Sequence, residues 1–131
     1  MPFSADEKSA WIARVNADRE FLLVARWTDV CFQVGCGDER HNFRVTAAKI
    51  EEVAEAAPEG SIRLEGSADA WSAFMQPIPV SPNHHVLGMD RRRSDFAIAQ
   101  GRHEFIQNLR VLTIALNLLR AASKEGSDER L

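Results

Sequence analysis

The chain has 131 residues, of which 45% are hydrophobic and 27% charged, so it is long enough for one domain with its own core. Its formal net charge is −3, whereas nucleic-acid binding proteins need a basic excess to contact phosphates. We therefore expect no nucleic-acid partner. We also expect a single domain over residues 1–122 and a flexible polar tail over residues 123–131, which lack the apolar content to order themselves.

The first part of the chain predicts two helices. Ser4 can cap a helix whose first turn is acidic, which hydrogen bonding and the helix dipole both favour. Trp11 and Val15 then lie on one apolar stripe of that helix. Asp18 restarts the helical pattern, and Phe21 begins the apolar face of a second helix.

The apolar period then changes from about four residues to two, which indicates strands. Residues 30–34 alternate between apolar and polar, a turn follows at residues 35–39, and residues 41–46 alternate again, so we expect a hairpin. Residues 50–54 fit a third strand or a short helix, and the pattern does not decide between them. Residues 61–65 alternate cleanly and predict a further strand.

The second half predicts helices around one more strand. Ser67 is a suitable cap for a helix that ends before Pro77 and Pro79, and a short helix is expected near residues 84–90. Residues 94–99 alternate as a strand. Gly101 turns the chain into the longest predicted helix, residues 102–121. Because the strand-to-strand links are short, we expect an α+β fold with about five mainly antiparallel strands covered by helices.

The last predicted helix is apolar over more than one face. Residues 111–119 are apolar except for Thr113 and Asn117. A helix that is apolar nearly all round is buried on several sides. Three explanations are open: the fold wraps this helix, the helix lines a cavity, or it packs against a second subunit.

Cysteine use and targeting signals indicate a cytoplasmic protein. Cys31 and Cys36 lie on opposite faces of the predicted strand, where they cannot form a disulfide, so both are read as free thiols of a reducing compartment. Residues 1–10 carry charges in place of the apolar run of a signal peptide. Residues 111–119 are too short for an integral membrane span, which needs about eighteen or more apolar residues.

A search for catalytic and metal-binding motifs finds little. Neither a metalloprotease motif nor a nucleotide-binding loop occurs, and no cofactor or metal is expected. Two weaker pairs of groups are worth naming. Cys31, with Asp29 next to it and His41 across the hairpin, can form a nucleophile–base pair, and Asp90 with His84 or His85 can form an acid–base pair. We favour structural roles for all of them and therefore lean away from an enzyme.

Several segments together resemble the sterol carrier protein 2-like domain family. They are the strand Asp29-Val30-Cys31-Phe32-Gln33-Val34-Gly35, the strand Phe43-Arg44-Val45, the segment Ser61-Ile62-Arg63-Leu64-Glu65-Gly66-Ser67-Ala68-Asp69-Ala70-Trp71, and a late strand followed by Gly101 and a C-terminal helix. The resemblance covers residues 21–122 and rests on the order of elements more than on identical residues.

The resemblance implies an antiparallel sheet covered by helices, with an apolar tunnel between them that binds a fatty-acyl chain, a sterol or another lipid. The positions that match the tunnel wall are Trp71, Phe74, Met75, Leu87, Met89, Phe105, Leu109, Leu112 and Leu116.

Three functions are therefore considered. The first is noncatalytic binding of a small apolar molecule or lipid in a cavity under the last helix. The second is a small isomerase or cyclase with the cone-shaped fold of nuclear transport factor 2, although that fold ends in a long curved sheet and this chain ends in a helix. The third is an oligomerisation or accessory module that forms a homodimer through the C-terminal helix.

Overall fold

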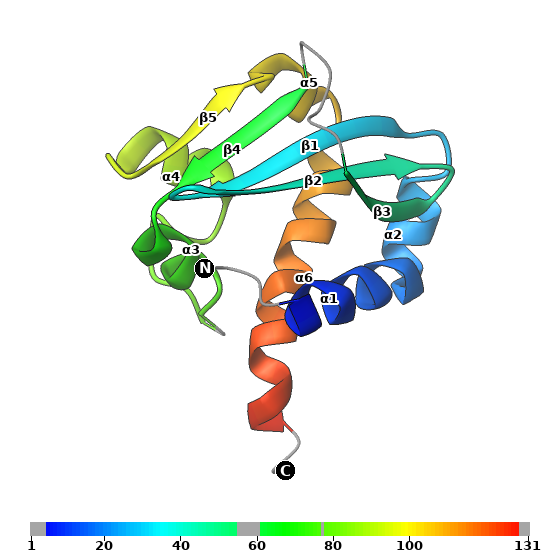
Figure 1. Cartoon of the computed structure of the whole chain (residues 1–131), viewed down its shortest axis with the longest axis horizontal. Helices are drawn as coiled ribbons and strands as arrows, with labels where there is room; N and C mark the ends of the chain where they lie inside the picture. Colours follow the sequence, from blue (N-terminus) through cyan, green and yellow to red (C-terminus); the bar gives the residue numbers. More distant parts are fainter. Residues whose placement is uncertain (1–4, 55–60, 77, 129–131) are drawn as a thin grey trace.

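The computed structural model describes residues 5–54, 61–76 and 78–128, and these fold into one five-stranded sheet with helices around it (Figure 1). The elements are α1 Ala5–Ala17, α2 Arg19–Val24, β1 Asp29–Cys36, β2 Glu39–Thr46, β3 Lys49–Val53, β4 Ile62–Gly66, α3 Ala68–Phe74, α4 Val86–Arg92, β5 Phe96–Gln100, α5 Arg102–Gln107 and α6 Leu109–Asp128.

The strands lie in the order β3-β2-β1-β4-β5. Three of the four neighbouring pairs are antiparallel, as expected, and the segment left open at residues 50–54 contains the strand β3. Short links join β1 to β2 and β2 to β3, whereas β4 and β5 are joined through α3 and α4. The central pair, β1 with β4, is parallel. The parallel pairing reflects the chain path. β3 is an edge strand beside β2, and the next strand, β4, lies on the other side of β1 and runs in the same direction as β1.

Local signals in the sequence set two of the helix starts. The Asp18 carboxylate accepts a hydrogen bond from the Phe21 amide over 2.8 Å and caps α2. The Ser67 hydroxyl accepts one from the Ala70 amide over 3.0 Å and caps α3. Both caps satisfy amides that a helix leaves unpaired at its N-terminus. The cap expected at Ser4 lies outside the described residues.

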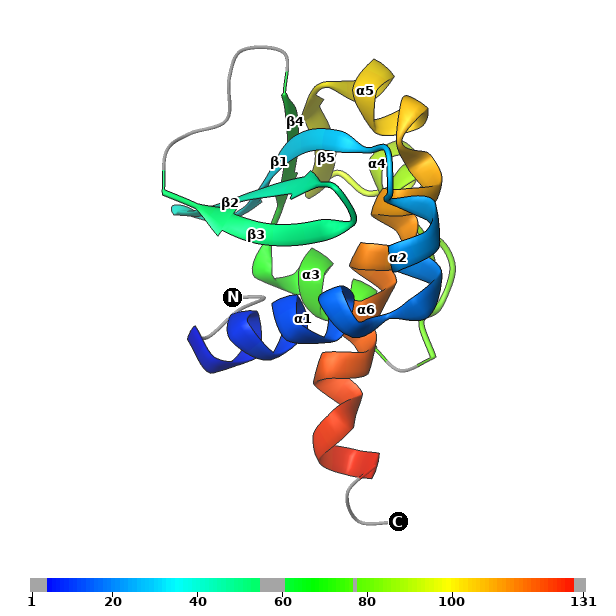
Figure 2. The same ribbon diagram turned by 90° about the vertical axis from the view of Figure 1, so that its right-hand side faces the viewer.

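One face of the sheet packs against α1, α2, α3 and α6, as Figure 2 shows from the side. Alternate residues of β1, from Val30 to Cys36, point to this face and are buried, whereas Cys31 points to the other face. Both cysteines are free, as the strand pattern predicts. The inward side chains of neighbouring strands complete this core layer: Phe43, Val45, Ile50, Ile62, Leu64, Phe96 and Ile98.

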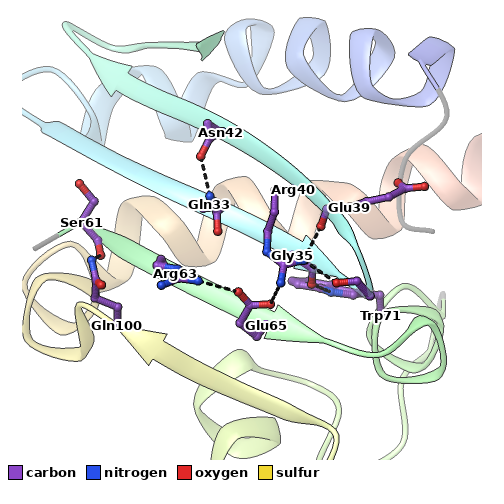
Figure 3. A network of polar contacts seen from close by, with 11 residues as sticks. Gln33, Gly35, Glu39, Arg40, Asn42, Ser61, Arg63, Glu65, Trp71 and Gln100 are labelled. Atoms are coloured by element: carbon purple, nitrogen blue, oxygen red, sulfur yellow. Dashed lines mark hydrogen bonds and ion pairs between the residues drawn. The ribbon is translucent and has the colours of Figure 1, made fainter. Parts of the chain in front are cut away.

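The opposite face of the sheet carries a network of polar side chains (Figure 3). The Gln33 amide donates to Asn42 Oδ1 over 2.9 Å. The Glu65 carboxylate lies between Arg40, at 3.1 Å, and Arg63, at 3.4 Å. Gly35 leaves room for this ion pair, because a Cβ there would lie 2.5 Å from Glu65 Oε2. This face is therefore mainly polar, and the large buried apolar side chains of the strands point to the helical side.

Side chains close both edges of the sheet. At the β3 edge, Asn16 of α1 donates to Ile50 O over 3.0 Å and accepts from Ile50 N over 2.8 Å. At the β5 edge, the Asp90 carboxylate accepts from the Ile98 amide over 2.9 Å. These bonds occupy backbone groups that an open edge would offer to another strand.

The last predicted helix is two helices, which corrects the single helix expected over residues 102–121. Asn108 leaves helical geometry at φ −112° and ψ 25°, and both its amide and its side chain donate to Glu104 O. This competition between side chain and backbone breaks the helix there. α6 then runs to Asp128, into the segment expected as a flexible tail, and residues 129–131 lie outside the described part.

The N-terminal helices explain most of the apolar surface of α6. Trp11 of α1 is fully buried, and its indole N–H donates to Ala115 O of α6 over 2.8 Å. Phe21 of α2 is also fully buried, and α2 lies alongside α6. Of the three explanations for the apolar helix, wrapping by the chain itself therefore accounts for the side that faces α1 and α2.

The backbone of the turn between β2 and β3 is strained, so substitutions that suit this turn should stabilise the protein. Ala47 and Ala48 have φ values of 50° and 62°, a left-handed backbone that costs alanine about 1–2 kcal/mol per residue. Asparagine and glycine suit such a two-residue hairpin turn. We expect the double substitution Ala47→Asn and Ala48→Gly to raise the free energy of unfolding by about 1 kcal/mol in urea denaturation. A lower midpoint for the variant would contradict this description of the turn.

Candidate functional site

The candidate site is a narrow crevice on the inner side of α6. It has an empty volume of about 160 Å³ and is too narrow to hold a water molecule. Four apolar and three polar side chains line it: Phe74, Val86, Phe105 and Leu116, with His85, Thr113 and Asn117. These residues come from α3, α4, α5 and α6 and from the segment just before α4, so the crevice lies where the helices of the second half of the chain meet.

α3 contributes one wall of the crevice, and its N-terminal cap holds this helix in position. Ser67 caps α3 and also donates its hydroxyl to Asp95 over 2.6 Å. The Arg93 guanidinium donates to both oxygens of Asp95, at 2.8 and 3.0 Å. Hydrogen bonds from Arg93 and Ser67 hold the pKa of Asp95 well below its usual range. Asp95 therefore ties the start of α3 to the residues that join α4 to β5.

His85 forms a second wall and has a defined tautomer. Its Nδ1 accepts a hydrogen bond from the Leu87 amide over 3.1 Å and caps α4. A neutral imidazole that accepts at Nδ1 carries its proton on Nε2, so Nε2 donates to Thr113 Oγ1 over 2.8 Å. The ring also meets Phe105 edge to face, with centroids 6.5 Å apart. His85 thus links α4 to α6 across the crevice.

The stability of the fold towards acid should depend on His85. Burial, and then the positive charge of Arg120, lowers the pKa of His85 from its ordinary value of 6.5. The folded protein then binds fewer protons at this site than the unfolded chain, so the contribution to stability is present above pH 6.5 and is lost as pH falls through the folded pKa. In urea unfolding from about pH 8 to about pH 5, the wild type should lose more stability than His85→Gln.

The neighbouring histidine gives a matched control for that measurement. His84 is exposed, and its side chain takes no part in capping α4. His84→Gln should therefore keep the pH slope of the wild type. Equal slopes for the wild type and His85→Gln would contradict the assignment of the titration to His85.

A wide groove lies on the other side of His85 and Thr113. It runs between α2 and α6, is open to solvent, and has an empty volume of about 750 Å³ that includes this solvent. His85 and Thr113 line both the groove and the crevice, and the groove is completed by Glu20, Leu109, Arg110 and Ile114. The hydrogen bond between His85 and Thr113 is therefore part of the partition between the surface groove and the buried crevice.

Arg120 of α6 binds the end of α3 and the loop before α4, next to the crevice. Its guanidinium donates to the carbonyl oxygens of Phe74, Asn83 and His84 over 2.6, 3.0 and 2.7 Å. It donates to Asn117 Oδ1 over 2.8 Å, and its carbon lies 4.2 Å from the centroid of the Phe74 ring. Burial lowers the pKa of Arg120. Arg120 therefore connects α3, the loop before α4 and α6 through a single side chain.

The residues predicted for a tunnel wall separate into three groups. Phe74, Phe105 and Leu116 line the crevice, and Leu109 lines the groove. Met75 and Leu87 are half-buried and pack against the edge of the core. The remaining three residues are fully or almost fully buried in closely packed core and do not line the crevice: Trp71, Met89 and Leu112.

Trp71 shows why a buried aromatic need not face a cavity. Its indole N–H donates to Gly35 O over 2.9 Å, and its ring meets Phe74 and Phe96 edge to face. These contacts lock α3 onto β1 and β5. In the sequence, Trp71 and Phe74 belong to the same apolar stripe, and periodicity alone does not separate a packing residue from a lining residue.

Sequence reasoning missed the polar part of the site. It considered His85 only as an acid or base and did not select Thr113, Asn117 or Arg120. Among the apolar lining residues it did not select Val86. Thr113 and Asn117 interrupt an apolar run at a spacing of four, which places them on one face of a helix. Arg120 follows that run at a spacing of three from Asn117. This pattern is the signal that could have identified them.

The structure does not assemble either of the catalytic pairs considered above. The Asp90 carboxylate binds the Ile98 amide and Arg102, and although burial raises the pKa of Asp90, these hydrogen bonds lower it on balance. His41 lies opposite Val34 on the inner face of the sheet, whereas Cys31 points to the outer face. Each of these residues has another structural role or the wrong orientation for the proposed chemistry.

Within residues 5–54, 61–76 and 78–128, no group of three or more histidine, cysteine or carboxylate side chains is arranged to hold a metal ion. In the same part of the chain, no helix has the length and apolar content needed to cross a bilayer.

The arrangement of elements matches solved structures of one fold. One is a conserved hypothetical protein from Thermus thermophilus described as a candidate sterol carrier protein, with a TM-score of 0.67, 10% identity, and coverage of 92% of this chain and 88% of that chain. The chain has the sterol carrier protein 2-like fold. This confirms the expected α+β fold class and the resemblance inferred from the strand and helix order.

A second match supports the same fold. UbiJ-SCP2, a ubiquinone synthesis protein, superimposes with a TM-score of 0.60 and 12% identity over 88% of this chain and 93% of that chain. No protein-family model matches the sequence, and the comparison with curated proteins gives no match. At these identities the comparisons establish the sterol carrier protein 2-like fold alone.

Proposed function

We propose that this protein binds a small apolar ligand, a lipid or fatty-acyl molecule, in the crevice beneath α6 and performs no chemistry on it. The observation that carries the proposal is the position of the crevice: in a sterol carrier protein 2-like fold, four apolar side chains, Phe74, Val86, Phe105 and Leu116, converge under the closing helix. The lipid binding suggested at the level of this fold supports the same conclusion.

The crevice must widen to accept such a ligand. It is too narrow to hold a water molecule, whereas small-molecule pockets usually have volumes of about 300–1,000 Å³. The partition towards the groove is held in part by the hydrogen bond between His85 and Thr113, and a neutral bond of this kind contributes about 1 kcal/mol. We propose that the ligand enters from the groove between α2 and α6, past these two side chains.

A matched pair of substitutions tests the proposal. Leu116 and Leu119 are both almost fully buried on α6, but Leu116 lines the crevice and Leu119 does not. Leu116→Phe should fill the crevice, whereas Leu119→Phe adds the same volume elsewhere in the core. We expect the wild type to bind the neutral fluorescent probe N-phenyl-1-naphthylamine, and we expect Leu116→Phe to weaken this binding about tenfold.

Two results would overturn the proposed function. One is the absence of probe binding to the folded wild type at saturating concentrations. The other is an equal loss of binding in Leu116→Phe and Leu119→Phe, because the effect would then follow from core packing and not from the crevice. Circular dichroism on all three proteins shows that the comparison is made between folded chains.

The homodimer expected through the last helix remains a prediction. Leu112, Leu116 and Leu119 of α6 are each about 1% exposed and are buried within their own chain, so they leave no apolar face for a partner at these positions. Light scattering on the full chain measures the oligomeric state directly.

A further inference from the structure

Arg120 has an unusual charge environment for a half-buried guanidinium. All of the oxygens that accept its hydrogen bonds are neutral: three backbone carbonyls and the amide oxygen of Asn117. Among the carboxylates whose side chains the structure describes, none forms an ion pair with it. Burial lowers the pKa of Arg120, and no described carboxylate counteracts that effect. Its positive charge is therefore uncompensated within the described chain.

Three other arginines in this half of the fold, Arg93, Arg102 and Arg110, each have a carboxylate partner. Arg93 binds both oxygens of Asp95, and Arg102 binds Asp90. Arg110, in the wall of the groove, lies 3.8 Å from Glu20. A buried charge is normally paired, because leaving it without a partner costs free energy. Arg120 is the exception among these four, and it is also the one beside the crevice.

Two residues connect Arg120 directly to the crevice. The Phe74 ring lines the crevice and also lies under the guanidinium, at 4.2 Å. Asn117 lines the crevice, and its Oδ1 accepts from Nη1 of Arg120 over 2.8 Å. An alkyl chain packed against Phe74 would therefore have its end close to the guanidinium, where Asn117 Oδ1 now lies.

We propose that Arg120 binds the anionic head group of an amphiphilic ligand, a carboxylate or phosphate whose alkyl chain lies in the crevice, an inference that rests on the proposed function. One oxygen of the head group replaces Asn117 Oδ1 on Nη1. This exchange is inexpensive because Asn117 is exposed and its amide can be solvated instead. The anion gains a charge-assisted hydrogen bond and neutralises the guanidinium.

The test compares ligands that share a chain and differ in head group. Dodecanoate, dodecyl phosphate and dodecanol are each used, below their critical micelle concentrations, to displace N-phenyl-1-naphthylamine from the full-length protein. The wild type should bind at least one of the two anions about tenfold or more tightly than dodecanol. The ranking of the two anions then distinguishes a carboxylate ligand from a phosphate ligand.

Two variants assign this preference to Arg120. Arg120→Gln should bring the affinities for the anions down to that for dodecanol. Asn117→Asp places a carboxylate next to Arg120 on the exposed side and should weaken binding of the anions about tenfold more than it weakens binding of dodecanol. Because Asn117 is exposed, this second variant keeps the test informative if Arg120→Gln does not fold. Arg26→Gln removes an exposed charge elsewhere and should change neither affinity.

The possible results separate this inference from the proposed function. Equal binding of dodecanol and both anions by the wild type would overturn the role of Arg120 and leave lipid binding in place. Preference for anions that persists in Asn117→Asp would also overturn it. If the probe binds and none of the three compounds displaces it, the role of Arg120 is overturned. If the probe itself fails to bind, both the proposed function and the role of Arg120 are overturned.

Discussion

Replacing Trp11 with alanine should lower the free energy of unfolding by about 3–5 kcal/mol, the usual cost of removing a large aromatic side chain from a core. Trp11 is fully buried between the sheet and α6. Its ring meets Phe43 of β2 edge to face with centroids 5.0 Å apart, and its N–H donates to Ala115 O. The substitution therefore leaves a cavity and a buried carbonyl without this donor.

Urea denaturation followed by circular dichroism measures this effect. Leu23→Ala is a suitable control, because Leu23 is 69% exposed on α2 and should change stability by less than about 0.5 kcal/mol. A loss below about 1 kcal/mol for Trp11→Ala would mean that α1 is not packed on α6 as described.

Gly101→Ala is the second substitution with a large expected effect, a loss of about 2–5 kcal/mol. Gly101 precedes α5 with a φ of +76°, which is unfavourable for any residue with a side chain. A Cβ there would also lie 2.7 Å from Ile62 Cα and 2.9 Å from Ser61 O. Both contacts are with backbone, so no side-chain rotation can relieve them, and β4 would have to shift.

Gly37→Ala distinguishes the cost of the positive φ from the cost of the close approach of a Cβ to β4. Gly37 has a φ of +59° in the β1–β2 turn, and a Cβ there would meet nothing within 4 Å. We expect it to cost about 1–2 kcal/mol from backbone strain alone. The difference between the two variants in chemical denaturation then gives the cost of the close approach to β4. Equal losses would show that Gly101 is needed only for its backbone conformation.

Much of the fold was predictable because its signals are local. The alternation in residues 30–34 and 41–46 indicated the central hairpin, and Asp18 and Ser67 marked helix starts that the structure has at the expected places. The parallel pairing of β1 with β4 was not predictable in this way. It depends on where the chain re-enters the sheet, and connection length alone does not determine that.

The break at Asn108 was missed for a related reason. The apolar pattern continues through it, and the break comes from a polar side chain that competes for Glu104 O. Similarly, the apolar richness of α6 was visible in the sequence, but its cause was not. Trp11 and Phe21 cover much of it from distant positions in the chain. Trp11 and Ala115 are 104 positions apart, a separation that hydrophobic periodicity does not show.

Only apolar residues of the candidate site were predicted from the sequence. Phe74, Phe105 and Leu116 were selected because the resemblance to the sterol carrier protein 2-like family places them in a tunnel wall, and they do line one crevice. The polar residues that border it were not selected. His85 and Arg120 act through contacts with Thr113 and with the backbone of Phe74, 28 and 46 residues away. Contacts of this range arise from the tertiary fold and leave no pattern in a single sequence.

The central claim is that an apolar ligand binds in the crevice and not on the surface. Amide chemical shifts of the labelled protein, recorded during titration with dodecanoate, test this directly. We expect the largest changes at Phe74, Val86, Phe105 and Leu116, with His85 and Thr113 responding as the ligand passes between groove and crevice. Shifts confined to exposed apolar positions such as Trp27, Ile78 and Val80, with the crevice residues unchanged, would contradict the account.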